Sequence, residues 1–168
     1  MVKHLGWVLV LTAACGDGSG SEMKATATFA GINGQTVTGT GEFTLAGGKV
    51  TATFSFTAAP AGVHGMHIHA NAACTAEGMD AGAHWDTTGA GAPGHGLPPA
   101  GHIGDLGNIT ISAAGTGTLT HSNAEWTLGD GAATDVLPHA IILHELMDDG
   151  SMPSSGGRWG CALIVMQN

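Results

Sequence analysis

Two histidines lie at positions i and i+2 in the segment Gly65-Met66-His67-Ile68-His69. Residues two apart on a β-strand point to the same face, so both imidazoles can reach one ion, although such a pair can also be a plain polar strand face. The further candidate ligands are His84, His95, His102, Asp105 and His144. Imidazole suits copper and zinc, and three imidazoles with one carboxylate are ordinary zinc chemistry. Calcium and magnesium prefer oxygen ligands, so the pattern indicates a transition metal.

Short segments in which apolar and polar residues alternate predict the strands that would position these ligands. Alternation covers Met23–Phe29, Val50–Phe56, Ile109–Ser112, Gly117–Thr120 and Glu125–Leu128, and Val37 with Glu42–Leu45 suggests a further strand. The apolar runs His139–Leu143 and Cys161–Met166 predict strands that are buried more deeply. No window after residue 22 has helical periodicity. About eight short strands separated by Gly and Asn turns indicate an all-β fold, either an antiparallel sandwich or a flattened barrel.

The stretch from Ala70 to Leu106 has no strand pattern, and loops of that length are usually functional or disordered. It contains Cys74 and several of the candidate ligands, so one disulfide and one metal could hold it in place. Cys161 is the other cysteine of the domain. Two buried free thiols are the alternative interpretation of this pair.

The N-terminus has the pattern of an export signal. Residues 1–15 combine Lys3, a short apolar run from Leu5 to Ala14 and then Cys15. The run is too short to cross a bilayer, which takes about 20 residues. The ending Leu11-Thr12-Ala13-Ala14-Cys15 resembles a bacterial lipobox, which predicts lipidation of Cys15; an ordinary signal peptide is the alternative. Residues 16–22 are predicted to form a flexible tether, and residues 23–168 the folded domain.

Acidic side chains dominate the charge of the chain. There are 13 Asp and Glu residues against 4 Lys and Arg, which excludes the basic surface that nucleic-acid binding needs. Without the first 15 residues, the remaining cations are Lys24, Lys49 and Arg158. Any electrostatic attraction of an anion must therefore depend on very few residues.

Three motifs together resemble the Cu,Zn superoxide dismutase family, over about residues 23 to 166. Gly62-Val63-His64-Gly65-Met66-His67-Ile68-His69 is similar to the copper-binding strand of that family, and His102-Ile103-Gly104-Asp105-Leu106-Gly107-Asn108 is similar to its zinc-binding segment. Gly157-Arg158-Trp159-Gly160-Cys161 looks like the segment with its active-site arginine and second cysteine. The spacing His69-Ala70-Asn71-Ala72-Ala73-Cys74 resembles the bacterial periplasmic members.

The resemblance implies a fold and a set of ligands. The fold would be an eight-stranded antiparallel Greek-key sandwich or flattened barrel with long metal-binding and active-site loops. The implied copper ligands are His67, His69, His84 and His144; the implied zinc ligands are His84, His95, His102 and Asp105. Cys74 and Cys161 would form the disulfide of the family, Asp148 would accept hydrogen bonds from His67 and His95, and His64 would be structural.

The resemblance also implies an activity: two superoxide anions and two protons become oxygen and hydrogen peroxide through copper redox cycling, with a structural zinc. His84 would take up the proton that peroxide later receives, and Arg158 would align the incoming anion. A non-catalytic copper- and zinc-binding protein on the same fold is the competing hypothesis. The implied location is the periplasm or cell envelope, with membrane attachment only through Cys15, and the sequence leaves the choice between monomer and homodimer open.

Overall fold

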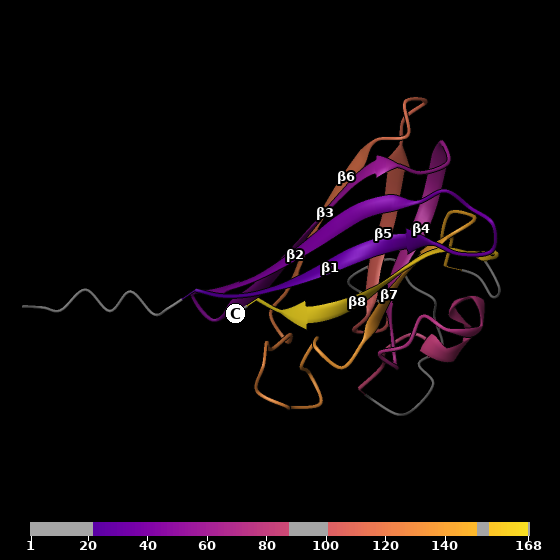
Figure 1. Ribbon diagram of the computed structural model, residues 1–168. Helices are drawn as coiled ribbons and strands as arrows, with labels where there is room; N and C mark the ends of the chain where they lie inside the picture. Colours follow the sequence, from indigo (N-terminus) through magenta and orange to yellow (C-terminus); the bar gives the residue numbers. More distant parts are fainter. Residues whose placement is uncertain (1–21, 88–100, 151–154, 168) are drawn as a thin grey trace, which may run out of the picture.

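The computed structural model describes residues 22–87, 101–150 and 155–167. Within these ranges eight antiparallel strands form one sheet that curves into a nearly closed barrel (Figure 1). The strands are β1 (Met23–Gly31), β2 (Thr38–Ala46), β3 (Lys49–Ala58), β4 (Gly62–His69), β5 (Asp105–Ile111), β6 (Gly117–Asn123), β7 (Ala140–His144) and β8 (Arg158–Met166). The predicted all-β fold is therefore confirmed.

The order of the strands brings distant parts of the sequence together. It runs β5-β4-β7-β8-β1-β2-β3-β6, and the two end strands, β5 and β6, lie beside each other without a hydrogen-bonded ladder. The β3–β4 and β6–β7 connections both cross between the two halves of the barrel, as in a Greek key. As a result β4, β7 and β8 are neighbours, and these strands carry His67, His69, His144 and Arg158.

Glycines on β2 leave room for the aromatic core of the barrel. A Cβ atom built on Gly39 would lie 2.7 Å from the ring of Phe56, and one on Gly41 would lie 2.9 Å from the ring of Phe54. These residues are also direct cross-strand partners on β2 and β3. Each ring therefore packs over the backbone of a glycine, which accounts for two of the 29 glycines of the chain.

Two local features differ from the sequence-based expectations. Glu125–Leu128 is not a strand, because Thr127 makes only an isolated bridge to Asp135. The Asp135 carboxylate accepts backbone N–H groups of the following loop, including that of Gly129, and so replaces a ladder. In addition, the long loop after β4 contains a short 3₁₀ helix, η1 (Ala76–Ala81), which no helical pattern indicates.

Candidate metal centre

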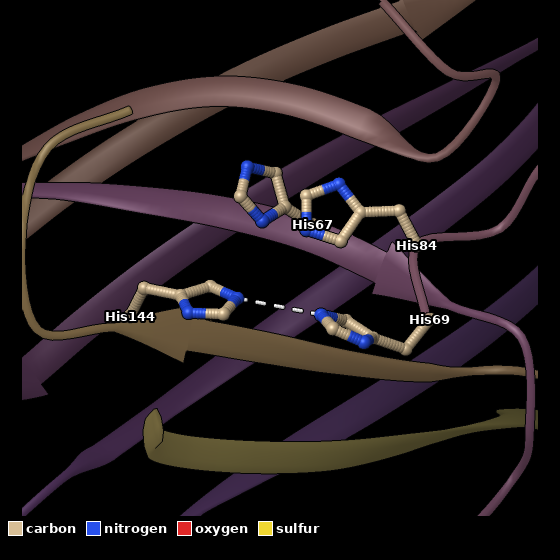
Figure 2. A group of neighbouring side chains, drawn as sticks. All are labelled: His67, His69, His84 and His144. Atoms are coloured by element: carbon tan, nitrogen blue, oxygen red, sulfur yellow. Dashed lines mark hydrogen bonds between the residues drawn. The ribbon is translucent and has the colours of Figure 1, made fainter. Parts of the chain in front are cut away.

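Four imidazoles meet over strands β4 and β7 (Figure 2). His67 and His69 come from β4, and His144 comes from the end of β7, which pairs with β4. His84 lies in the long loop and is held beside β4 by an isolated bridge to His69. One ligand atom from each of the four lies within 4.8 Å of the others. The structure thus brings together all four residues for which the sequence predicted a shared ion.

Hydrogen bonds fix which ring nitrogens can bind a metal. The Nε2 of His67 donates to the Asp148 carboxylate at 2.8 Å, so its Nδ1 carries the lone pair, and that atom is buried without a hydrogen-bond partner among the described residues. The Nδ1 of His69 donates to the carbonyl of Gly82 at 2.9 Å, which leaves its Nε2 as the acceptor. This Nε2 lies 3.3 Å from the Nε2 of His144. Buried imidazole nitrogens that converge in this way, with the Nδ1 atoms of His67 and His144 lacking a partner among the described residues, fit a bound transition-metal ion.

Burial favours the neutral form of His67, His69 and His144. It lowers the pKa values of His69 and His144 to about 2, and repulsion from the cationic forms of His84 and Arg158 acts in the same direction. Burial also lowers the pKa of His67, although the hydrogen bond to Asp148 opposes this effect. Neutral imidazole is the form that binds a metal ion, so His67, His69 and His144 are ready to coordinate one.

We expect the metal-free protein to lose stability as the pH falls from about 7 to about 5. The unfolded chain takes up protons below the ordinary histidine pKa of 6.5, whereas folded His69 and His144 stay neutral down to about 2. Their contribution to the free energy of unfolding is therefore complete above 6.5 and is lost below it. Urea titrations of chelator-treated protein check this, with a His69→Gln/His144→Gln variant as control. An equally steep pH dependence in that variant would contradict it.

A second cluster adjoins the first and shares His84. The Nδ1 of His84 lies 2.8 Å from one carboxylate oxygen of Asp105, and the Nδ1 of His102 lies 3.3 Å from the other. Burial opposes ionisation of Asp105, but the hydrogen bond with His84 and nearby imidazoles hold the pKa of this carboxyl below its ordinary value. His95, the fourth predicted ligand of this cluster, lies outside the described residues.

Asp148 connects the first cluster to the loop that follows β7. It is buried, accepts the hydrogen bond from His67, and is itself held by Asn108. The side chain of Asn108 donates to the Asp148 carbonyl at 2.8 Å and accepts from the Asp148 N–H at 2.7 Å. This double contact fixes the carboxylate, and the carboxylate fixes the ring of His67. The hydrogen bond predicted between Asp148 and His95 lies outside the described residues.

His64 lies outside both clusters, in a structural position. Its Nδ1 faces the carbonyls of His144 and Glu145 at 3.0 and 2.9 Å, and its Nε2 faces the carbonyl of Pro60 at 3.0 Å. The ring is 2 % exposed. It therefore ties the start of β4 to the residue that follows β7.

Arg158 is held beside the four-histidine cluster by backbone carbonyls of the long loop. One guanidinium nitrogen donates to the carbonyl of Gly78 and another donates to that of Gly82 at 2.7 Å. A disulfide between Cys74 and Cys161 ties this loop to β8, which confirms the pairing that the sequence resemblance implied. The disulfide thus brings the two carbonyls and the arginine together.

A pocket of about 520 Å³ opens onto the cluster. His69, His84 and His144 line it together with Arg158, and its other lining residues are Asn33, Glu77, Met79, Ala83, Gly156 and Gly157. Sequence reasoning did not identify Asn33 or Glu77 as part of the site. Asn33 is part of an Asn-Gly pair, which indicates only a turn. It reaches the site through a hydrogen bond to the backbone carbonyl of Arg158, which is 125 residues away in the sequence. A small anion could enter this pocket and meet both the imidazoles and the guanidinium.

The fold is a Greek-key barrel, and its two candidate metal-binding clusters share His84. These two features together are those of a β-barrel with two adjacent metal sites. The family model for copper/zinc superoxide dismutase matches residues 37–164 of this chain. Superoxide dismutase [Cu-Zn] 2 of Brassica juncea is 30 % identical over 131 residues, which cover 71 % of this chain and 83 % of that protein. A crystal structure of the clock protein EA4 superposes with a TM-score of 0.74 at 23 % identity, covering 98 % of this chain and 100 % of the other, and supports the fold.

The chain therefore belongs to the copper/zinc superoxide dismutase family. The four-histidine cluster and the His84, His102 and Asp105 cluster match the copper and zinc sites of this family. Among the described residues, no helix is both long and apolar enough to span a membrane.

Proposed function

We propose that this protein is an active superoxide dismutase, which converts two superoxide anions and two protons into oxygen and hydrogen peroxide. The observation that carries the proposal is the pocket itself. It presents an anchored arginine beside three imidazoles of the four-histidine cluster, and a site that only stored metal would have no use for that cation.

The two clusters have the donor atoms that the implied metals need. Copper would be held by His67, His69, His84 and His144, and zinc by His84, His95, His102 and Asp105. The unpartnered buried Nδ1 of His67 and the ionised Asp105 support these assignments. Copper, when bound, would supply the one-electron chemistry that superoxide disproportionation requires.

The residues of the chain would bind the anion and supply a proton. Two backbone carbonyls accept hydrogen bonds from the guanidinium of Arg158 and so fix its position. From that position the guanidinium would orient superoxide inside the pocket. His84, which belongs to both clusters, would carry a proton and pass it to the peroxide product. Asp148 would keep His67 in one tautomer.

The direct test is superoxide consumption by the purified domain, with and without copper and zinc. We expect a fast rate that requires both metals to be loaded and that the chelated protein lacks. A protein that binds both metals tightly without consuming superoxide would contradict the enzymatic proposal and indicate a metal-binding relative.

We expect Arg158→Ala to lower the rate by about 10- to 100-fold and to remove most of its dependence on ionic strength. Arg158 is the cation that lines the pocket, where it is accompanied by Glu77. Lys24 is paired with Glu22 at 3.1 Å, away from that pocket. Initial rates at a series of salt concentrations check this, with Lys24→Ala as the matched control. If the Arg158→Ala protein kept the wild-type salt slope, steering by this residue would be excluded.

We also propose that the protein is exported and lipid-anchored, as in periplasmic bacterial members of the family. Residues 1–15 would form the signal peptide with its lipobox-like end, which is cleaved before the lipidated Cys15, and residues 16–22 would be a tether to the domain at 23–168. The Cys74–Cys161 disulfide supports export, because disulfides persist in oxidising compartments. Intact-mass spectrometry of the membrane fraction should find a diacylated chain that begins at Cys15. A mature chain without Cys15, or with an unmodified one, would refute the anchor.

A further inference from the structure

The non-glycine residues with a positive φ angle gather at one place in the structure. Among the described residues there are three, Asn33 (φ 54°), Ala76 (φ 50°) and Glu77 (φ 57°). Asn33 lies in the β1–β2 turn, and the other two begin η1. Residues in this conformation cost free energy and persist where the surrounding structure holds them, often at functional sites. Two of them adjoin the groups that hold Arg158: Asn33 bonds to the arginine backbone, and Glu77 precedes Gly78, which accepts from the guanidinium.

The side chain of Asn33 joins the two segments that hold Arg158. Its amide nitrogen donates to the backbone carbonyl of Arg158 at 2.8 Å and to that of Glu77 at 3.3 Å. Glu77 directly precedes Gly78, whose carbonyl accepts a hydrogen bond from the guanidinium. The amide therefore contacts the backbone of the arginine and the backbone next to its carbonyl acceptor.

Ile32, the neighbour of Asn33 in this turn, also contacts the two segments that hold Arg158. The N–H of Ile32 donates to the carbonyl of Trp159 at 2.9 Å. Its side chain packs on Gly78, where an added Cβ would lie 2.7 Å from the Ile32 Cδ1. The β1–β2 turn thus contacts both η1 and the start of β8, on the side of the pocket where Asn33 is a lining residue.

We infer that Asn33 is a positioning residue for Arg158: its amide fixes the guanidinium relative to the carbonyls of Gly78 and Gly82, and so sets the affinity of the pocket for a small anion. Asn suits this role because it accepts the left-handed conformation and offers an amide donor. The inference deepens the proposed function, on which it rests, by adding a determinant of anion binding that is separate from the metal ligands.

The first experiment needs no metal. Arg158 is the only arginine of the chain, so its side-chain N–H signals can be assigned in a ¹⁵N spectrum without ambiguity. In Asn33→Gly, which keeps the left-handed backbone, we expect these protons to exchange with water about three- to tenfold faster, as for the loss of an ordinary hydrogen bond. Asn33→Asp, which cannot donate, should behave alike, whereas Thr36→Ala in the same turn should leave the rate unchanged. Equal exchange rates in all four proteins would overturn the inference.

The second experiment measures azide binding to the copper-loaded protein by absorption spectroscopy. Asn33→Gly should weaken azide binding about three- to tenfold, with little change in copper content or melting temperature. In an Arg158→Ala background the same substitution should have no further effect, because Asn33 acts through the guanidinium. An additive loss in the double variant would overturn the inference. Neither readout uses superoxide, so an inactive protein with the expected shifts would refute the proposed function alone.

Discussion

Replacing His84 with alanine is expected to lower metal-dependent superoxide consumption by at least about 100-fold. Removing a partner that only orients a metal ligand typically costs about 10- to 100-fold in affinity or activity, and His84 belongs to the ligand set itself. It is also the one residue that both clusters share. The substitution should therefore reduce the retention of copper and of zinc together, and it would remove the group that is proposed to hold the proton.

The measurement combines the rate of superoxide consumption with the metal content after dialysis. His121→Ala is the matched control, because the ring of His121 packs against Trp126 at a centroid distance of 5.2 Å and lies in neither cluster. That control should keep both metals and the full rate. Should His84→Ala lose copper but keep zinc at the wild-type level, the shared role of His84 would be wrong.

The second large effect concerns the disulfide. The Cys74–Cys161 bond closes a loop of 87 residues, and the chain-entropy estimate for a loop of that length is about 4 to 5 kcal/mol of stability. We expect a Cys74→Ser/Cys161→Ala protein to lose roughly this amount in the free energy of unfolding. Because the same loop supplies the carbonyls that hold Arg158, the rate of superoxide consumption should fall as well.

Urea denaturation of the metal-free protein checks the change in stability without a contribution from bound ions. Reduction of the wild-type disulfide with a thiol serves as the control, since it breaks the same bond and changes no residue. Both treatments should lower the midpoint by a similar amount. A double variant as stable as the oxidised wild type would show that packing alone holds the loop.

Much of the fold was predictable because the alternation of residues is local. Ala25, Ala27 and Phe29 on one face of β1 are buried as their spacing requires, and the same holds for Phe54 and Phe56 on β3. The pair His67 and His69 was recognisable for the same reason, since a strand places both side chains on one face. Bringing His144 to that pair takes the β6–β7 crossing, and bringing His84 takes the fold of the long loop back onto His69. The resemblance of whole motifs implied both, and no single spacing did.

The groups that hold Arg158 were not predictable. They are the backbone carbonyls of Gly78 and Gly82, and a carbonyl has no signature in the sequence. Asn33 contacts the arginine backbone across 125 residues, so no local pattern connects the two. The prediction of a strand at Glu125–Leu128 was wrong for a comparable reason. Trp126 and Leu128 are buried at alternate positions, as in a strand, while the side chain of Asp135 takes the place of a pairing partner.

The glycines beneath the aromatic rings divide the barrel into regions that should tolerate mutation differently. Where Gly39 and Gly41 face Phe56 and Phe54, the interior is filled by single large side chains, and the opposite backbone has no atoms that could move in to replace them. Around Ile141, whose cross-strand partners are Ile68 and Ala162, aliphatic side chains share the space and can adjust to one another. Over evolutionary time, substitutions should therefore accumulate in the aliphatic half beneath the metal centre, while each glycine and its facing ring can change only together.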